Sequence, residues 1–336
     1  MTAYHTDDII AVDDLVVVYP DGTRAVDGIS FRVRAGEFFG FLGPNGAGKS
    51  TTIKTLTTLL RMTSGYASVA GAMVDRDPDE VRRSIGVVSQ DTVVDVDLTG
   101  RENLLLFGRL QHVSSEVLEE RVDQLLRVVE LEDVAGKPAG RYSGGMRKRL
   151  DLASALVHEP SLLFLDEPTT GLDPQSRAAL WEYLETINRE KGVTIFLTTQ
   201  YMEEADRLCK RIAIIDHGRL IGEGTPGELK SALGGETIEL SFESSGNPEL
   251  VARAAKVLGT IAGLSQLSTA TSSLSASAAN AERLLPSVIT TLAKEDIHPS
   301  ALSVSTPTLD DVFLRLTGRR IRSDELDRRT TEPFLQ

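Results

Sequence analysis

A glycine-rich loop between a predicted strand and a predicted helix constrains the fold of this chain more than any other feature. Residues 43–50 read GPNGAGKS and fit the pattern G-x-x-x-x-G-K-[ST]. The loop follows the apolar run 38–42 and precedes a helical pattern over residues 49–60. Glycines let the backbone turn its N–H groups inward, and the start of the next helix carries a positive partial charge. A chance glycine-rich turn is the alternative, but the strand–loop–helix order favours a site for a nucleotide's phosphates.

The loop also predicts how such a nucleotide would be held. Lys49 is expected to reach the terminal phosphates, and the hydroxyl of Ser50 is expected to bind Mg²⁺. The residues predicted to line the phosphate site are Gly43, Asn45, Gly46, Ala47, Gly48, Lys49, Ser50 and Thr51.

Two adjacent acids, Asp166 and Glu167, end the apolar run 162–165. Open α/β sheets bind their ligands at the carboxyl ends of their strands. Because consecutive side chains of a strand point to opposite faces, the two acids are predicted to have different roles. Asp166 is expected to reach Mg²⁺ through its water shell, and Glu167 to position or deprotonate the attacking water. An ordinary solvated strand end is the alternative, but the nearby phosphate loop favours the catalytic interpretation.

A second glycine-rich loop precedes a basic helical segment. Residues 142–146 read YSGGM, and residues 147–149 are Arg-Lys-Arg. Ser143, Gly144 and Gly145 would therefore offer another phosphate site at the start of a helix. A single nucleotide pocket has no obvious use for this second loop.

The second loop resembles the signature loop of ATP-binding cassette (ABC) proteins, usually Leu-Ser-Gly-Gly-Gln, with Tyr and Met at its outer positions. Other motifs of that family follow in the expected order over about residues 9–229. Tyr19 resembles the aromatic residue that stacks on adenine, Gln90 the glutamine of the Q-loop, and residues 171–173 the D-loop. Taken singly, Tyr19 is equally a strand-end aromatic and Gln90 equally a polar loop residue.

The resemblance implies that ATP and Mg²⁺ are bound between two copies of the chain. In the family, the phosphate loop of one subunit faces the signature loop of the other, so Ser143, Gly144 and Gly145 would contact the γ-phosphate across the interface. ATP then holds the dimer closed, and hydrolysis loosens it. The residues that the resemblance assigns to the metal are Ser50, Gln90 and Asp166.

One position departs from the common family pattern. Gln200 stands where most ABC ATPases have a histidine that contacts the γ-phosphate. Its amide carries no titratable charge, but it can donate a hydrogen bond to phosphate or orient water, so Gln200 joins Glu167 and Lys49 as a predicted catalytic residue. Together with TTQYMEEAD at residues 198–206 and PTLDDVF at residues 307–313, this departure resembles the daunorubicin/doxorubicin-resistance type of bacterial ABC ATPase.

Proteins of that type pair with a separate membrane permease and export drugs or lipids, so the same function is expected here. A helical insert at about residues 91–140, with Gln90 as its hinge, would grip the permease, and an apolar groove is expected there. One alternative is a soluble ABC-type ATPase acting on ribosomes or DNA. Such factors commonly carry two cassettes or a long coiled coil, and this chain has one cassette and no long heptad run. A regulatory subunit with little turnover is the other alternative, which Gln200 keeps open.

The composition of the chain limits which partners it can bind and where in the cell it is expected. The formal net charge of −13 opposes the negative charge of nucleic acid, so no nucleic-acid partner is expected. No apolar run approaches the roughly 18–20 residues that cross a bilayer, and the start of the chain lacks a cationic signal-peptide region. The single cysteine, Cys209, fits a reducing compartment. These features predict a cytoplasmic protein, and the family resemblance implies that it is attached to the cytoplasmic face of the membrane through a permease.

The predicted fold class is α/β. Its main part is a P-loop ABC ATPase core over residues 1–233, with a mixed, RecA-like sheet and a helical subdomain at about residues 91–150. Apolar runs 162–165, 194–197 and 212–215 alternate with helical patterns over 175–190 and 201–208, which is typical of parallel, doubly wound strands.

Two further segments follow the core. Residues 234–318 are expected to form a small α+β accessory domain, which is ferredoxin-like if the Ser/Ala-rich stretch 268–281 is not a loop. An amphipathic helix with Leu309, Val312, Phe313 and Leu316 inward would close it. The charged segment 319–336 is predicted to be a mobile tail.

Overall fold

The computed structural model describes residues 8–233, 235–242, 248–278 and 280–317. The predicted tail, residues 319–336, lies outside this part. The chain divides into two compact units between Thr225 and Pro226, and each unit has a buried apolar core. None of the helices in the described ranges combines the length and the apolar character that crossing a membrane requires.

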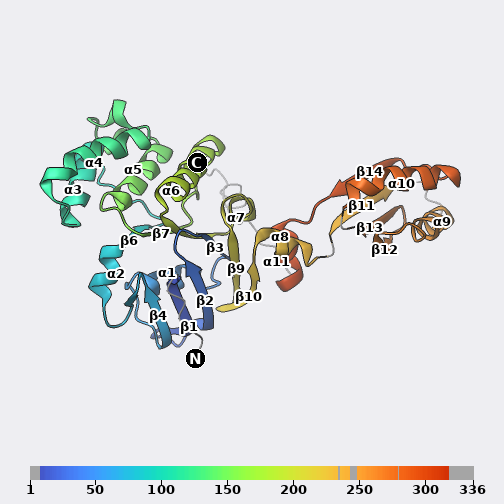
Figure 1. Ribbon diagram of the computed structural model, residues 1–336, viewed down its shortest axis with the longest axis horizontal. Coiled ribbons are helices and arrows are strands. Elements are labelled where there is room, and N and C mark those ends of the chain that lie inside the picture. Colours follow the sequence, from blue (N-terminus) through green and yellow to red (C-terminus); the bar gives the residue numbers. More distant parts are fainter. Residues whose placement is uncertain (1–7, 234, 243–247, 279, 318–336) are drawn as a thin grey trace, which may run out of the picture. The chain divides into compact units, whose positions relative to one another are not determined.

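A six-stranded sheet lies at the centre of the first unit (Figure 1). Its strands in spatial order are β10 (Arg219–Gly224), β9 (Arg211–Asp216), β3 (Phe38–Leu42), β8 (Thr194–Thr199), β7 (Leu162–Asp166) and β6 (Ile85–Val88). The strands from β9 to β6 run parallel, and β10 pairs antiparallel with β9. Strands β3 and β8 are buried along their whole length, as expected where both faces of a sheet are covered. The predicted α/β class is confirmed, and the sheet is mixed.

The first strands of the chain form a separate sheet. Its strands in order are β2 (Arg24–Arg34), β1 (Asp8–Val18), β4 (Ser64–Val69) and β5 (Ala72–Met73), and every pairing is antiparallel. A turn closed by the Gly22 N–H donating to the Tyr19 carbonyl returns the chain along β1. Residues 31–33, expected to be a short strand, are the end of the longer β2, whose buried side chains alternate along its length.

Five phenylalanines join the two sheets. Phe31 of β2 stacks on Phe39 of β3 with ring centroids 5.9 Å apart, and Phe41 lies 5.5 Å from Phe31. Phe196 of β8 packs 5.6 Å from Phe39 and 5.4 Å from Phe164 of β7. Aromatic pairs at such distances contribute about 0.5–1.5 kcal/mol each beyond the area they bury. The cluster therefore holds β2 of the antiparallel sheet against β3, β8 and β7 of the central sheet.

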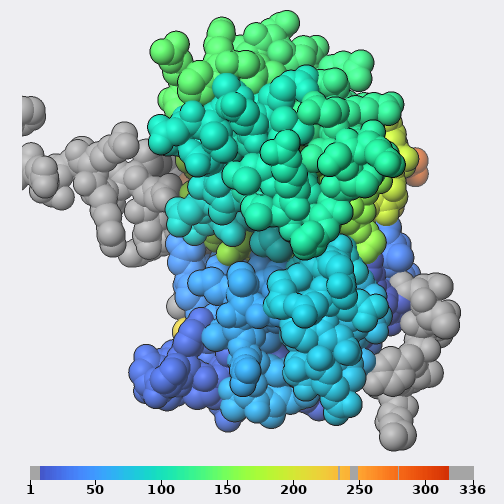
Figure 2. Space-filling model, turned by 90° about the vertical axis from the view of Figure 1, so that its left-hand side faces the viewer, coloured from blue at the N-terminus to red at the C-terminus, as the bar shows by residue number. Residues whose placement is uncertain are grey.

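Helices form much of the chain between β5 and β7. They are α2 (Pro78–Ser84), α3 (Gly100–Leu110), α4 (Ser115–Val128) and α5 (Gly144–Leu156), with single 3₁₀ turns at Glu132–Val134 and Ala139–Arg141. Helix α3 begins with a capping box, in which Thr99 accepts from the Glu102 N–H and the Glu102 carboxylate accepts from the Thr99 N–H. Figure 2 shows the side of this unit on which α2 lies below α3 and α4.

Two sequence predictions about helices of the first unit are wrong in detail. Helix α1 (Lys49–Leu56) ends before residue 60, because Thr58 adopts a φ of +65°, which a continuing α-helix does not allow. On α4, the predicted apolar stripe is buried at Leu118, Val122, Leu125 and Leu126, but Val117 is 43% exposed. Helices α3 and α5 cover the other side of α4, so Val117 lies at the uncovered edge of the stripe.

Two more helices flank the central sheet. Helix α6 (Pro174–Lys191) begins where the Asp173 carboxylate accepts from the Ser176 N–H, with Pro174 at its first position. Helix α7 (Met202–Leu208) follows β8 and leads to Cys209. The Cys209 thiol is buried, and its burial raises its pKa, as is typical of a cysteine that packs in a core.

Between its first and last helices, the second unit has the element order β-α-β-β-α-β of ferredoxin-like domains (Figure 1). Its elements are α8 (Pro226–Ser231), β11 (Glu236–Ser241), α9 (Pro248–Leu258), β12 (Leu264–Thr269), β13 (Ser273–Ala278), α10 (Ala281–Lys294), β14 (Ala301–Ser305) and α11 (Leu309–Thr317). The strand order is β12-β13-β11-β14. Most of the Ser/Ala-rich stretch is strand rather than loop, because Leu274, Ala276 and Ala278 alternate toward the core. Helix α8 packs against α11, so the unit begins at Pro226 rather than at residue 234.

The last helix buries most of its predicted face. Leu309, Val312 and Phe313 of α11 are buried, but Leu316 is 45% exposed. The inward orientation predicted for Leu316 is wrong, because it lies near the end of the helix, past the part that packs against its neighbour.

Candidate active site

The loop from Gly43 to Gly48 turns tightly from β3 into α1. Gly48 has a φ of +110°, and a β-carbon at this position would lie 2.5 Å from the carbonyl oxygen of Ala25. A β-carbon at Gly43 would lie 2.3 Å from the carbonyl oxygen of Ile215. Both positions therefore exclude side chains, and the loop can approach β2 and β9 closely.

Lys49 connects this loop to the end of β7. Its ammonium donates to the carbonyl oxygens of Gly43 at 2.8 Å and Pro44 at 3.2 Å. It also forms an ion pair with Glu167, with Nζ and Oε1 3.1 Å apart, and both side chains are at most 10% exposed. A buried pair of opposite charges at the carboxyl edge of a parallel sheet is the arrangement needed beside a transferring phosphate.

Glu167 has an unusual backbone conformation that accounts for this contact. It follows β7 directly and has a φ of +48°, which is rare for a residue other than glycine. Its N–H donates to the Thr198 carbonyl at 3.0 Å, and the Thr170 hydroxyl donates to Oε2 at 3.4 Å. These contacts hold the carboxylate toward Lys49.

Asp166 makes a different set of contacts from its neighbour. The Thr198 hydroxyl of β8 donates to Asp166 Oδ1 at 2.5 Å. Asp166 does not line the cavity that contains Glu167. The two adjacent acids thus point to different partners, but the reason is the turn at Glu167 after β7 ends and not alternation along the strand.

A cavity of about 390 Å³ brings most of the predicted residues together. The predicted residues that line it are Tyr19, Asn45, Gly46, Gly48, Lys49, Ser50, Thr51, Gln90, Glu167 and Gln200. The predicted residues that do not line it are Gly43, Ala47, Asp166, Ser143, Gly144 and Gly145. Tyr19 is placed beside the loop by a hydrogen bond between its hydroxyl and that of Thr51 at 3.1 Å.

Two lining residues were not found from the sequence. Ala25 of β2 lies against Gly48, and nothing in the spacing of the sequence connects the two. Thr170 follows Glu167 by three residues, so its nearness to the predicted catalytic acid was a usable signal.

The second glycine-rich loop starts helix α5, away from this cavity. The Ser143 hydroxyl accepts from the Met146 N–H at 3.2 Å, so Ser143 is the N-cap of α5. A β-carbon at Gly145 would lie 2.5 Å from the Ser176 hydroxyl oxygen of α6. The loop is therefore packed against α6 and leaves no room for a larger residue at Gly145.

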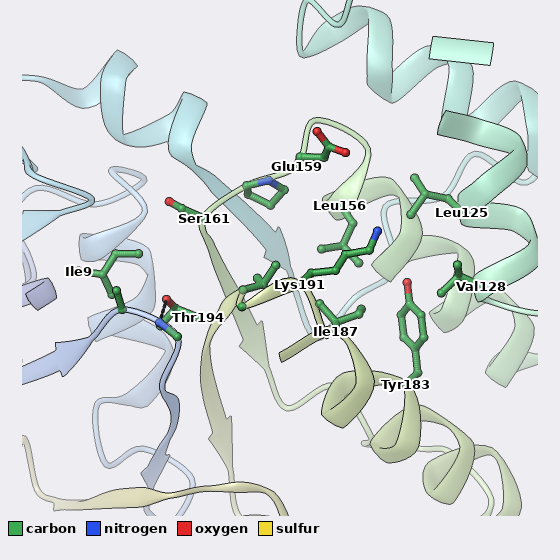
Figure 3. A pocket seen from close by; sticks show the side chains of 15 residues that line it. Ile9, Leu125, Val128, Leu156, Glu159, Ser161, Tyr183, Ile187, Lys191 and Thr194 are labelled. Carbon is green, nitrogen blue, oxygen red and sulfur yellow. Dashed lines mark hydrogen bonds between the residues drawn. The ribbon is translucent and has the colours of Figure 1, made fainter. Parts of the chain in front are cut away.

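Two other cavities in this unit are more apolar. One of about 300 Å³ lies among α3, α5 and β6, and its lining includes Leu59, Val87, Val93 and Phe107; we call it the α3–α5 groove. The other, of about 450 Å³, lies near the amino ends of β7 and β8 and is lined by Leu125, Val128, Tyr183 and Ile187 among others (Figure 3). It is larger than the polar cavity, but open α/β sheets bind their ligands at the carboxyl ends of the strands and not at the amino ends. The chemistry therefore belongs to the polar cavity.

Comparison with known proteins agrees with this geometry. Residues 26–170 match the family described as ABC transporter. The chain belongs to the ATP-binding subunits of ABC transporters, and it is an ATPase of that family.

Within the family it is similar to drug-resistance proteins. It is 45% identical to the daunorubicin/doxorubicin resistance ATP-binding protein of Streptomyces peucetius, over 92% of each chain. It is 38% identical to the linearmycin resistance ATP-binding protein of Bacillus subtilis, over 88% of this chain and 94% of that one. The resemblance predicted from short motifs is confirmed.

A solved structure matches the first unit. It is a dimeric ATP-binding cassette in a post-hydrolysis state with ADP and Pi bound, with a TM-score of 0.59 and 27% identity, and the match covers 64% of this chain and 98% of that one. Cassettes of this family thus dimerise, and the predicted fold and ATPase class are confirmed.

Proposed function

We propose that the chain forms a homodimer that hydrolyses Mg-ATP to drive a separate permease exporting a drug or a lipid. The contact of Lys49 with Glu167 at 3.1 Å, inside a cavity walled by the phosphate loop, carries this proposal. It joins a phosphate-binding cation to a candidate base in one site. The names of the relatives, which include daunorubicin/doxorubicin and linearmycin resistance, support the export class.

The residues of the site suit a nucleotide-bound Mg²⁺ ion. Mg²⁺ with a nucleotide needs only one or two protein oxygens, because phosphates and waters complete its octahedron. The described part of the chain has no group of three or more His, Cys, Asp or Glu side chains that could hold a metal alone, which agrees with such a shared site. Ser50, Asp166 and Gln90 are the proposed contacts, and the ion would supply charge neutralisation at the phosphates.

Four side chains of the protein have separate roles in binding and hydrolysing ATP. Lys49 balances negative charge at the terminal phosphate. Glu167 accepts a proton from, or orients, the attacking water. Gln200 lines the same cavity and offers an amide N–H to phosphate or water. Tyr19 supports the adenine end, since its hydroxyl is fixed to Thr51 at 3.1 Å.

A second copy gives Ser143, Gly144 and Gly145 a role at the nucleotide, since these residues do not line the cavity of their own chain. In a head-to-tail dimer, the loop of one subunit would contact the nucleotide of the other. Each nucleotide would then be held by both subunits, and loss of the γ-phosphate would weaken the interface.

The α3–α5 groove is the proposed docking site for the permease. Its lining includes Val93 and Phe107, and Leu59 beside it is 71% exposed. Exposed apolar residues around a groove mark a surface for a partner. Ser89 lines the groove and the next residue, Gln90, lines the nucleotide cavity. A permease bound in the groove would therefore be affected by changes at the nucleotide site. This docking would place the protein at the cytoplasmic face of the membrane.

Co-purification tests the partner. The tagged chain, extracted in mild detergent from its native membranes, is expected to retain an integral membrane protein, and Phe107→Glu should release it. Retention of ribosomes or DNA with no membrane protein would contradict the proposal. Arg121→Gln, on α4 and outside the groove, is the control and should keep the partner bound.

A further inference from the structure

A buried lysine joins helix α5 to the segment that carries Gln90. The Lys148 ammonium donates to the Ser89 carbonyl at 2.6 Å and to the Gln90 carbonyl at 3.3 Å. Its side chain is only 7% exposed. Helix α5 starts at the second glycine-rich loop, whereas Gln90 lines the nucleotide cavity. One side chain thus connects the two parts of the subunit that are proposed to meet ATP.

The segment held by Lys148 lies just beyond the sheet. Strand β6 ends at Val88, whose partner on β7 is Leu165. Ser89 and Gln90 follow that last paired residue, so the ladder does not extend to them. A charged donor to two successive carbonyls is a strong way to fix such a segment.

Asp151 accompanies Lys148 one turn later on α5. Its Oδ2 lies 3.9 Å from the Lys148 ammonium, and its side chain is 1% exposed. Neither carboxylate oxygen accepts a hydrogen bond of ordinary length and angle within the described residues, although the Val93 N–H is near enough to favour the charged form. Burial raises the pKa of Asp151 to about 6, and Lys148 and the Val93 N–H oppose that rise. Burial also lowers the pKa of Lys148, which Asp151, Asp166 and Asp91 oppose.

Stability does not explain such a pair. Two charges that are buried lose their hydration free energy. Their attraction offsets this loss only when the geometry of the pair is good. Here the charges are 3.9 Å apart, and the Asp151 carboxylate has no hydrogen bond of ordinary geometry to make up for its lost hydration. Apolar residues of similar size would hold α5 equally well, but they could not donate to the carbonyls of Ser89 and Gln90.

We propose that Lys148 is a positioning residue for ATP hydrolysis, which holds the Ser89 and Gln90 carbonyls so that Gln90 stays at the nucleotide cavity. Asp151 keeps the ammonium in its buried position on α5. A displacement of α5 would then pull directly on Gln90. This inference rests on the proposed role of Gln90 in the site.

The first test compares steady-state hydrolysis by the purified full-length chain and its Lys148→Met variant. The kcat is expected to fall about tenfold or more, because small misplacements in a site have effects of that size. The KM for ATP is expected to change less than about threefold, since the phosphate loop is intact. Lys148→Arg keeps a cation and should recover part of the lost kcat.

A second variant separates positioning from folding. Lys148→Met alone leaves Asp151 buried without a counter-ion, so Lys148→Met/Asp151→Asn removes both charges. The double variant is expected to melt no lower than the wild type and to keep the low kcat. Recovery of wild-type kcat in the double variant would overturn the proposal, because the pair would then only balance charge.

The control is Arg121→Gln. Arg121 of α4 also donates to a backbone carbonyl, that of Val157 at 3.1 Å, and pairs with Glu159 at 2.8 Å, but it lies outside the cavity. Its loss should leave kcat unchanged. Wild-type kcat in Lys148→Met, or an equal loss in Arg121→Gln, would also overturn the inference.

Hydrogen exchange tests the contact without relying on turnover. Amides of residues 89–91 should exchange faster in Lys148→Met, with those of α1 unchanged. If the amides of residues 89–91 exchange at the same rate in both proteins, Lys148 does not restrain this segment and the proposal fails. If Gln90→Ala hydrolyses ATP normally while exchange still depends on Lys148, the proposed role of Gln90 fails but the contact stands.

Discussion

Lys49 and Glu167 neutralise each other in a cavity where both are nearly excluded from water. A bound γ-phosphate would compete with Glu167 for the Lys49 ammonium, because the phosphate carries more negative charge. The carboxylate would then be freed toward the attacking water. In the proposed mechanism, this exchange of partners by Lys49 would link ATP binding to catalysis.

Lys49→Ala tests this link. Turnover of ATP is expected to fall at least about a hundredfold, as when one preorganised donor to a transition state is removed. Lys54→Ala, on the exposed side of the same helix, should keep its rate and serves as the control. A phosphate-release assay measures both, and substantial activity in Lys49→Ala would remove the lysine from the mechanism.

The buried carboxyl of Asp151 predicts a dependence of stability on pH. Its pKa is about 6 in the folded chain, against about 3.9 in the unfolded chain. Between these values the folded chain binds more protons, so this group stabilises the fold at low pH and loses that contribution as the pH rises toward 6. The loss is on the order of 3 kcal/mol at most.

Denaturant unfolding of the wild type and Asp151→Asn between pH 4.5 and pH 7 measures this loss. The wild type is expected to lose free energy of unfolding relative to Asp151→Asn as the pH rises. Subtraction removes the opposite effect of His158, whose pKa is lowered by burial. Parallel curves for the two proteins would show that the Asp151 carboxyl titrates normally.

At the scale of elements, helix α5 packs against strand β6 with almost no space between their backbones. A β-carbon at Gly86 of β6 would lie 2.3 Å from the Ala155 carbonyl oxygen of α5. The same two elements meet again where Lys148 holds the carbonyls after β6. If Lys148 positions Gln90 as proposed, a change in the separation of α5 and β6 would move Gln90.

Gly86→Ala is expected to destabilise the chain by about 2–3 kcal/mol, because backbone atoms cannot yield as a flexible side chain does. Gly136→Ala is the matched control, since a β-carbon there meets nothing within 4 Å. Thermal unfolding of both variants measures the difference. An equal Tm for the two would show that β6 and α5 can separate without cost.

The sequence predicted the elements whose structure depends on neighbouring residues, and it missed those that depend on contacts between distant segments. The order strand, loop and helix around residues 38–56 was predictable, because glycines and a lysine at fixed spacing have few other uses. The separate antiparallel sheet was not predicted, since its pairing depends on contacts between segments far apart in the chain. Periodicity placed Val117 and Leu316 in buried stripes, but it cannot tell where a neighbouring helix stops covering a face. Ala25 enters the cavity through tertiary packing alone.

At the scale of the whole molecule, the proposed homodimer divides the site between residues of one chain and residues of a second copy. One chain supplies the phosphate loop, Glu167 and Gln200 to the cavity. Ser143 is the N-cap of α5 and does not line that cavity. Backbone N–H groups at the start of a helix that do not line the cavity of their own chain would suit the nucleotide of another copy.

Glu167→Gln tests the assembly. The variant removes the charge that activates water and that would repel the γ-phosphate, so it is expected to bind Mg-ATP, hydrolyse it very slowly and accumulate as a closed dimer. Light scattering coupled to size exclusion should give the mass of two chains with Mg-ATP and of one chain without it. Adding Ser143→Arg should return the mass to one chain while each cavity still binds ATP, because the arginine blocks only the loop that reaches the partner. A Glu167→Gln protein that binds ATP yet stays monomeric would contradict the shared site, and one that hydrolyses ATP at the wild-type rate would remove Glu167 from catalysis.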